Sequence, residues 1–190
     1  MENIVFDGQQ SDEKILAEIR PHIYSEIFAF VKVILILLIF YLVLLSISTL
    51  IPVVSGVIRL LSTVFLLISL VGFVSWMIMA YNRSVTYITD RRIMRFEQLS
   101  PIYKAKRALF WKEALKAKAY QTNIIWRMLK IGTVQVEPQA ADQESVRITD
   151  IYLFEDLANY IDKIIYIIKN KPQDISTLRS FIPKFKGMRD

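Results

Sequence analysis

The stretch from Val33 to Asn82 decides the fold of this chain. Val33–Ile58 reads VILILLIFYLVLLSISTLIPVVSGVI and contains no charged residue. After Arg59, Leu60–Asn82 reads LLSTVFLLISLVGFVSWMIMAYN and contains none either. A helix needs about 20 residues to cross the hydrocarbon core of a bilayer, so each run is long enough to span a membrane. A Pro and a Gly within Ile51–Gly56 predict a short connector between the runs. The sequence therefore predicts a transmembrane helical hairpin.

The composition agrees with a membrane protein and excludes several kinds of site. Of the 190 residues, 54% are hydrophobic, and the mean hydropathy of +0.36 is high for a soluble domain. With no Cys and one His, the chain has no disulfide framework, no thiol nucleophile and no multi-histidine metal site. A cleaved signal peptide explains the first apolar run poorly, because that run begins about 30 residues in and lacks a small-residue cleavage pattern.

The basic residues near the membrane predict the orientation of the hairpin, because Lys and Arg are enriched on the cytoplasmic side. The connector offers only Arg59. The flanks on the side of the two termini offer Arg20, Lys32, Arg83, Arg91, Arg92 and Arg95. Both termini are therefore predicted to be cytoplasmic. From residue 83 to residue 190 there are 20 basic and 12 acidic residues, a net charge of +8, so this part carries the positive charge of the protein.

After the hairpin the hydrophobic period changes to alternation, which is typical of half-buried strands. The predicted strands are Ser84–Thr89, Arg92–Gln98, Tyr103–Trp111, Leu115–Tyr120, Thr133–Glu137 and Val146–Thr149. A last element has apolar residues at three- and four-residue spacing from Leu157 to Ile168, and Pro172 follows it. This pattern predicts one amphipathic C-terminal helix packed on a small, strongly bent antiparallel sheet.

These elements resemble the bacterial pleckstrin-homology (PH) family of the YdbS type, once catalogued as a domain of unknown function. The resemblance rests on Glu13–Leu16 leading to Arg20-Pro21-His22 ahead of the first span, and on Tyr87-Ile88-Thr89-Asp90-Arg91-Arg92-Ile93 at the start of the sheet. It also rests on Trp126–Val134, a helical turn followed by Gly and a strand. The match covers about residues 12–168. It implies a seven-stranded, partly open barrel that the C-terminal helix plugs, anchored at the cytoplasmic face, with no catalytic residues.

The predicted fold class is thus an α+β membrane protein: a two-helix transmembrane hairpin plus a PH-like antiparallel β-barrel or sandwich capped by a C-terminal helix. The predicted parts are a cytoplasmic N-terminal segment with a juxtamembrane helix at 1–32, the hairpin at 33–82 with spans at about 33–51 and 60–80, the PH-like domain at 83–171, and a flexible tail at 172–190.

The sequence offers no catalytic constellation. Its five glycines are isolated, so no phosphate-binding loop is present, and His22 beside Pro21 is best explained as an interfacial residue. The spans contain no Asp, Glu, His or Lys that could relay protons or coordinate an ion, so a transport function is not predicted. We expect no enzyme, no cofactor and no metal. No nucleic-acid-binding module is recognisable either.

The segment from Arg91 to Lys118 is the first candidate binding site, for anionic lipid or for a partner. It has nine basic residues against Glu97 and Glu113, a net charge of +7. The nine are Arg91, Arg92, Arg95, Lys104, Lys106, Arg107, Lys112, Lys116 and Lys118. Basic residues near an anionic membrane surface contribute about 1 kcal/mol each. The alternative is that these residues form the solvated outer face of a small barrel, and the sequence leaves both open.

A second candidate is the apolar turn around Trp126, Arg127 and Lys130. Such a turn can enter the membrane interface as a wedge, although more often it closes the end of a barrel. From the sequence we favour packing.

Two functions remain after these exclusions. The first is a non-enzymatic multi-pass protein of the bacterial inner membrane whose PH-like domain binds anionic lipid headgroups. The second is a scaffold that binds another membrane protein, or a second copy of itself, through the domain and the spans. Architecture does not choose between them.

Overall fold

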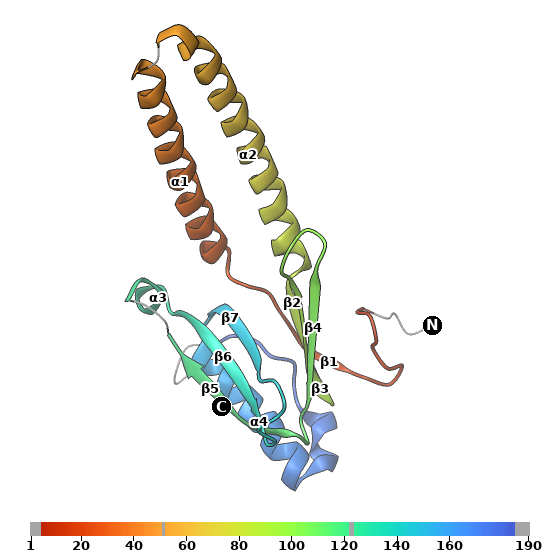
Figure 1. Cartoon of the computed structure of the whole chain (residues 1–190). Helices are drawn as coiled ribbons and strands as arrows, with labels where there is room; N and C mark the ends of the chain where they lie inside the picture. Colours follow the sequence, from red (N-terminus) through yellow and green to blue (C-terminus); the bar gives the residue numbers. More distant parts are fainter. Residues whose placement is uncertain (1–4, 51, 122–123, 185–190) are drawn as a thin grey trace. The chain divides into compact units, whose positions relative to one another are not determined.

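The computed structural model describes residues 5–50, 52–121 and 124–184. The chain forms two compact units (Figure 1). One unit is made of the two long helices, residues 23–82, and the other combines residues 1–22 with residues 83–190. The first 22 residues therefore belong to the same unit as the chain after the hairpin, although the whole hairpin separates them in sequence.

The helical unit contains α1 (Ile23–Leu50), the short 3-10 helix η1 (Pro52–Val54) and α2 (Ser55–Arg83). At 1.5 Å per residue these helices are about 42–44 Å long, enough for a hydrocarbon core of about 30 Å and its flanks. Both are long and apolar enough to cross a membrane. They contact each other through Phe30 and Phe73, whose ring centroids lie 6.4 Å apart, and through Phe40 and Phe65 at 5.9 Å. α1 begins at Ile23, upstream of Val33, and residues 5–22 contain no separate juxtamembrane helix.

The other unit begins with a four-stranded antiparallel sheet in the order β1-β2-β3-β4. Its strands are β1 (Ile15–Ile19), β2 (Val85–Thr89), β3 (Arg92–Gln98) and β4 (Lys104–Phe110). The two-residue alternation of apolar and polar residues predicted β2, β3 and β4. β1 was not predicted; it pairs across the hairpin with β2, Ile19 opposite Thr86, and buries Leu16 in the core.

A second antiparallel sheet has the order β5-β6-β7. It consists of β5 (Ala114–Tyr120), β6 (Ile131–Pro138) and β7 (Val146–Tyr152), with the short helix α3 (Ile124–Met128) between β5 and β6. The two sheets remain separate and do not close into a barrel. The α+β class and the antiparallel strands are therefore confirmed, whereas the description as a barrel is not.

The core of this unit lies between the sheets and α4 (Phe154–Asn170). The predicted stripe is correct, because Leu157, Ile161 and Ile164 are fully buried. Trp111, fully buried between β4 and β5, donates from Nε1 to the backbone oxygen of Thr89 at 2.8 Å.

The chain after α4 packs on the same unit, where the sequence predicted a flexible tail. η2 (Pro172–Thr177) is followed by Leu178, which is buried in the core. The backbone N–H of Phe181 donates to Leu16 of β1 at 3.0 Å, and the hydroxyl of Tyr160 donates to the backbone oxygen of Arg179 at 2.8 Å. Of the predicted tail, residues 185–190 lie outside the described part of the chain.

Candidate functional site

One edge of the sheet-containing unit holds both connections to the long helices. Ser84 alone joins α2 to β2, and Arg20-Pro21-His22 joins β1 to α1. β7 ends at the same edge, because the backbone N–H of His22 donates to Asp150 at 2.6 Å and the rings of His22 and Tyr152 lie 5.9 Å apart. We call the edge that holds His22, Ser84 and Tyr152 the span-side edge.

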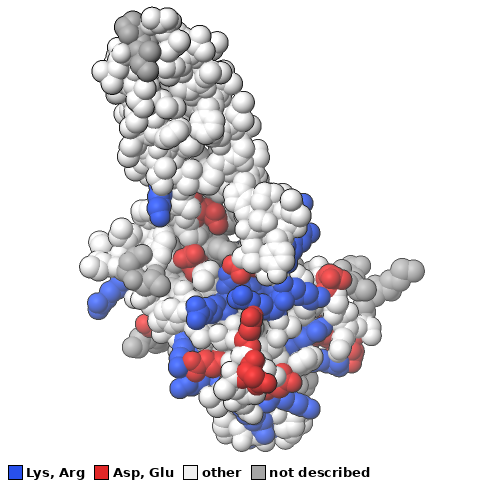
Figure 2. All heavy atoms as spheres, viewed as in Figure 1, with Lys and Arg blue, Asp and Glu red and all other residues white. Residues whose placement is uncertain are grey.

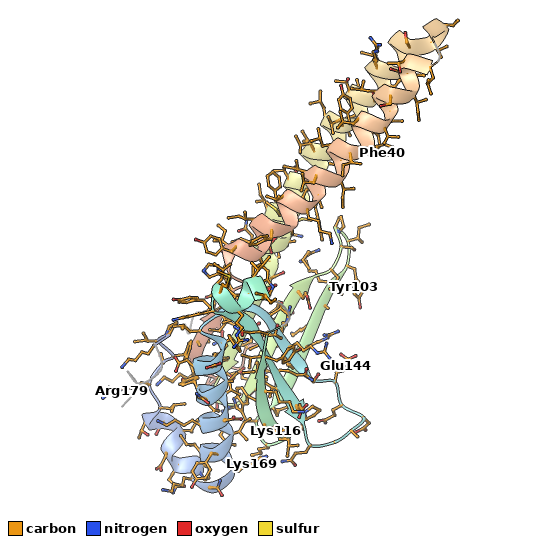
Figure 3. All side chains as sticks on the ribbon, turned by 90° about the vertical axis from the view of Figure 1, so that its left-hand side faces the viewer. Phe40, Tyr103, Lys116, Glu144, Lys169 and Arg179 are labelled. Atoms are coloured by element: carbon orange, nitrogen blue, oxygen red, sulfur yellow. The ribbon has the colours of Figure 1, made fainter. Side chains whose placement is uncertain are left out.

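The loop between β3 and β4 projects from this edge. Val85 at the start of β2 pairs with Phe96, and Gln98, two residues further along β3, pairs with Lys104. The loop Leu99–Tyr103 therefore lies beyond the point at which the chain enters β2. We call it the β3–β4 tip; Tyr103 marks it in Figure 3, at the end of the unit opposite Lys116 and Lys169. The exposed fractions of Ile102 and Tyr103 are 96% and 62%.

The turn that contains α3 lies at the same edge. Ile131, which starts β6, pairs with Tyr152, and the backbone N–H of Leu153 donates to Lys130 at 3.1 Å. The structure differs here from the expectation of packing, because none of the residues of α3 is buried. The exposed fractions of Ile124 and Met128 are 78% and 80%.

Of the second candidate site, Trp126 is half-buried, and Arg127 and Lys130 are exposed. The three residues thus lie beside the exposed apolar side chains of α3, on the span-side edge.

The nine basic residues of the first candidate site do not form one patch. Lys104 lies at the span-side edge and Lys106 is two residues further along β4. Arg92 pairs with Phe110 at the opposite end of the same strands, and Lys112 follows in the turn to β5. Phe110 lies six positions after Lys104, which corresponds to about 20 Å along a strand. The remaining members lie between these limits or beside Arg92 and Lys112: Arg91, Arg95, Arg107, Lys116 and Lys118.

Carboxylates balance most of this charge. The pairs are Arg91–Asp12, Arg92–Glu13, Arg95–Glu97, Lys106–Asp7, Arg107–Glu144 and Lys118–Glu137. Within the described chain, Lys104, Lys112 and Lys116 make no ion pair. Figure 2 shows one face of the molecule, on which acidic side chains lie among the basic side chains of the unit that contains the sheets. The net charge of +7 counted along the sequence is therefore not a continuous basic surface.

Arg92 is a structural residue. Its guanidinium donates twice to Glu13 at 2.9 Å and once to the backbone oxygen of Gly8 at 2.6 Å. Burial raises the pKa of Glu13, but the hydrogen bonds from Arg92, Gln10 and Thr89 outweigh that effect and hold the pKa below its usual value. The pair fastens the segment before β1 to the sheet.

Arg95 also faces the protein. Its exposed fraction is 8%, and it donates to Glu97 at 3.0 Å and to Thr149 of the other sheet at 3.3 Å. Burial lowers the pKa of Arg95, and burial raises the pKa of the nearby Asp150. Arg92 and Arg95 are therefore removed from the set of candidate lipid ligands.

A groove lies between β5 and α4, with a volume of about 700 Å³. Ala117, Ala119, Phe154 and Asp162 line it, and the backbone N–H of Ala117 donates to Asp162 at 2.7 Å. β5 is an edge strand, so one side of it has no strand partner within the described chain. The sequence did not predict this groove, because the groove depends on the order of the strands, which makes β5 the edge strand of its sheet.

The described residues include no cluster of three His, Asp or Glu that could hold a metal ion. Comparison with protein families, with curated proteins and with solved structures finds no match for this chain. Arguments about function therefore rest on the residues themselves.

Proposed function

We propose that this chain is a non-enzymatic integral protein of the bacterial inner membrane, with both termini cytoplasmic, whose PH-like domain binds anionic lipid headgroups. The observation that carries the proposal is the composition of the span-side edge. This edge holds both connections to the long helices together with three basic residues, Lys104, Arg127 and Lys130.

The connections between this edge and the long helices are short, which favours a position near the bilayer surface. One residue joins α2 to β2 and three join β1 to α1. An extended residue spans at most about 3.6 Å, so neither connection reaches much beyond about 10 Å. Charges at the span-side edge thus remain close to the headgroups. Charges at the other end, about 20 Å away along the strands, lie beyond the screening length of about 8 Å at physiological salt.

The order of elements supports the PH-like resemblance. A two-helix hairpin is followed by two small antiparallel sheets and one C-terminal helix whose apolar face packs on them. β1, supplied from before the hairpin, contains Leu16 of the Glu13–Leu16 motif on which the resemblance rests.

The test measures retention of lipid by the purified full-length chain in mild detergent. The protein is incubated with phosphatidylglycerol or phosphatidylcholine, repurified, and its bound lipid counted by mass spectrometry. Three basic residues at about 1 kcal/mol each predict a preference for the anionic lipid of up to about 100-fold at low salt.

The matched variants separate the two ends of the domain. Lys104→Gln/Arg127→Gln/Lys130→Gln removes three charges at the span-side edge, and Arg91→Gln/Lys112→Gln/Lys116→Gln removes three at the other end. We expect the first variant to lose the preference and the second to keep it. Equal retention of both lipids by the unmodified protein contradicts the proposal.

A scaffold is the second candidate function, and the groove beside β5 favours it, because this side of β5 has no strand partner within the described chain and bonds to α4 at Ala114 and Ala117. An extended segment of a partner can add to an edge strand through backbone hydrogen bonds. This function predicts a partner that copurifies in mild detergent and is lost on Ala119→Lys in the groove, while Lys104→Gln, at the span-side edge but outside the groove, leaves it bound. Recovery of the chain alone at native abundance argues against it.

A further inference from the structure

The most exposed large apolar side chains of the sheet-containing unit all lie on its span-side edge. Among the described residues of this unit, Ile102, Met128 and Ile124 have the highest exposed fractions, at 96%, 80% and 78%. Ile102 belongs to the β3–β4 tip, and Ile124 and Met128 belong to α3. Large apolar residues that gather at one place on a surface mark a contact.

We infer that the β3–β4 tip and α3 both insert into the interface of the membrane that holds the long helices, as two apolar wedges. This inference rests on the proposed membrane location and adds a contact to it, because the lipid-headgroup proposal requires charge alone. The membrane is the partner that we propose for this edge, because connections of only one and three residues join the edge to the long helices.

The backbone of the β3–β4 tip suits insertion. The N–H groups of Leu99 and Ser100 both donate to the backbone oxygen of Tyr103, at 3.1 and 3.2 Å. The N–H of Tyr103 donates to the hydroxyl of Ser100 at 3.0 Å, and Pro101 has no N–H. Three of the four N–H groups of this loop are therefore bonded within it, and only that of Ile102 is not. A loop with most of its N–H groups bonded loses less free energy on leaving water than one that bonds to water.

Polar side chains frame both wedges in the manner of interfacial segments. The amide of Gln98 donates to the backbone oxygen of Ser100 at 2.6 Å, and Lys104 follows the β3–β4 tip. Arg127 lies within α3 between Trp126 and Met128, and Lys130 follows α3. Basic side chains beside an apolar wedge reach the headgroups while the wedge enters the apolar layer.

The experiment uses the absence of Cys in the chain. Single-Cys variants Ile102→Cys and Met128→Cys of the full-length protein are labelled with an environment-sensitive fluorophore and reconstituted into vesicles of phosphatidylglycerol and phosphatidylcholine. Some of these vesicles carry lipids with a nitroxide quencher, either near the headgroup or deep in the acyl chain.

Two control positions calibrate the measurement. Tyr166→Cys labels an exposed aromatic position in α4, 58% exposed and away from the span-side edge, and Leu67→Cys labels the middle of α2. The inference predicts a blue shift at Ile102 and Met128, with stronger loss of emission from the shallow quencher than from the deep one. It predicts little quenching at Tyr166 and strong deep quenching at Leu67.

The outcomes distinguish the inference from the proposed membrane location. If Ile102 and Met128 emit as Tyr166 does while Leu67 is quenched, the wedges are wrong and the membrane location stands. If Leu67 is not quenched either, both fail. Quenching at one wedge and not at the other overturns the paired insertion.

Discussion

Replacing Glu13 by Gln tests how the segment before the hairpin is joined to the domain after it. The side chain of Glu13 is fully buried and that of Arg92 is 13% exposed, with 2.9 Å between their charged atoms. Removing one charge of a buried pair costs about 3–5 kcal/mol, and the partial exposure of Arg92 places this case at the lower end. We therefore expect Glu13→Gln to lower the free energy of unfolding by about 3 kcal/mol, a large part of the stability of a typical domain.

The assay is urea unfolding of the full-length chain in detergent, followed by the fluorescence of Trp111. Trp76 and Trp126 are replaced by Phe, so that Trp111, bonded to Thr89 beside Glu13, is the only reporter. Glu18→Gln is the control, because it removes the exposed pair with Arg20, and exposed pairs contribute about 0–1 kcal/mol.

The pH dependence gives an independent check. The pKa of Glu13 in the folded chain lies below its usual value, so the carboxylate contributes stability above the unfolded pKa. That contribution is lost as the pH falls through the folded pKa. The gap between the unmodified protein and Glu13→Gln should therefore narrow in acid. A Glu13→Gln variant as stable as Glu18→Gln at neutral pH would refute the reasoning.

Three further predictions concern packing and topology. Gly132→Ala should lower the free energy of unfolding by about 1–3 kcal/mol, because the added Cβ would lie 2.5 Å from the ring of Phe154. Gly72→Ala is the control, because a Cβ added there meets no neighbouring group within 4 Å. Urea unfolding measures both variants. Leu178→Ala should cost about 2–4 kcal/mol in the same assay if the chain after α4 packs in the core, whereas a cost near zero would restore the flexible tail. A Cys at Val53, 95% exposed in η1, should react with an impermeant maleimide added outside intact cells, and a Cys at Lys112 should react only after permeabilisation; the reverse pattern would invert the predicted topology.

The elements that the sequence predicted well are those with a local signal. The two long helices, β2 to β7 and the amphipathic α4 each show their period within one segment. β1 has only five residues, Ile15–Ile19, and its partner β2 lies about 70 residues later, beyond the hairpin. Nothing local marks it as a strand of that sheet.

The candidate site was harder to predict, because its charges are balanced by distant residues. Arg92 pairs with Glu13, 79 positions away in sequence, and Arg107 of β4 pairs with Glu144 in the loop between β6 and β7. A count of basic residues along Arg91–Lys118 cannot show these pairs. The apolar residues of α3 have the same pattern whether the turn packs or projects, so only the structure shows that Ile124 and Met128 are exposed.

The most direct test of the account is hydrogen–deuterium exchange of the full-length chain in nanodiscs with and without anionic lipid. The account predicts slower exchange with anionic lipid at 99–104 and 124–130, the two projections of the span-side edge, and unchanged exchange at 110–116 at the other end of the domain. Exchange that is the same in both lipids at the span-side edge, or slowed only at 110–116, would contradict it.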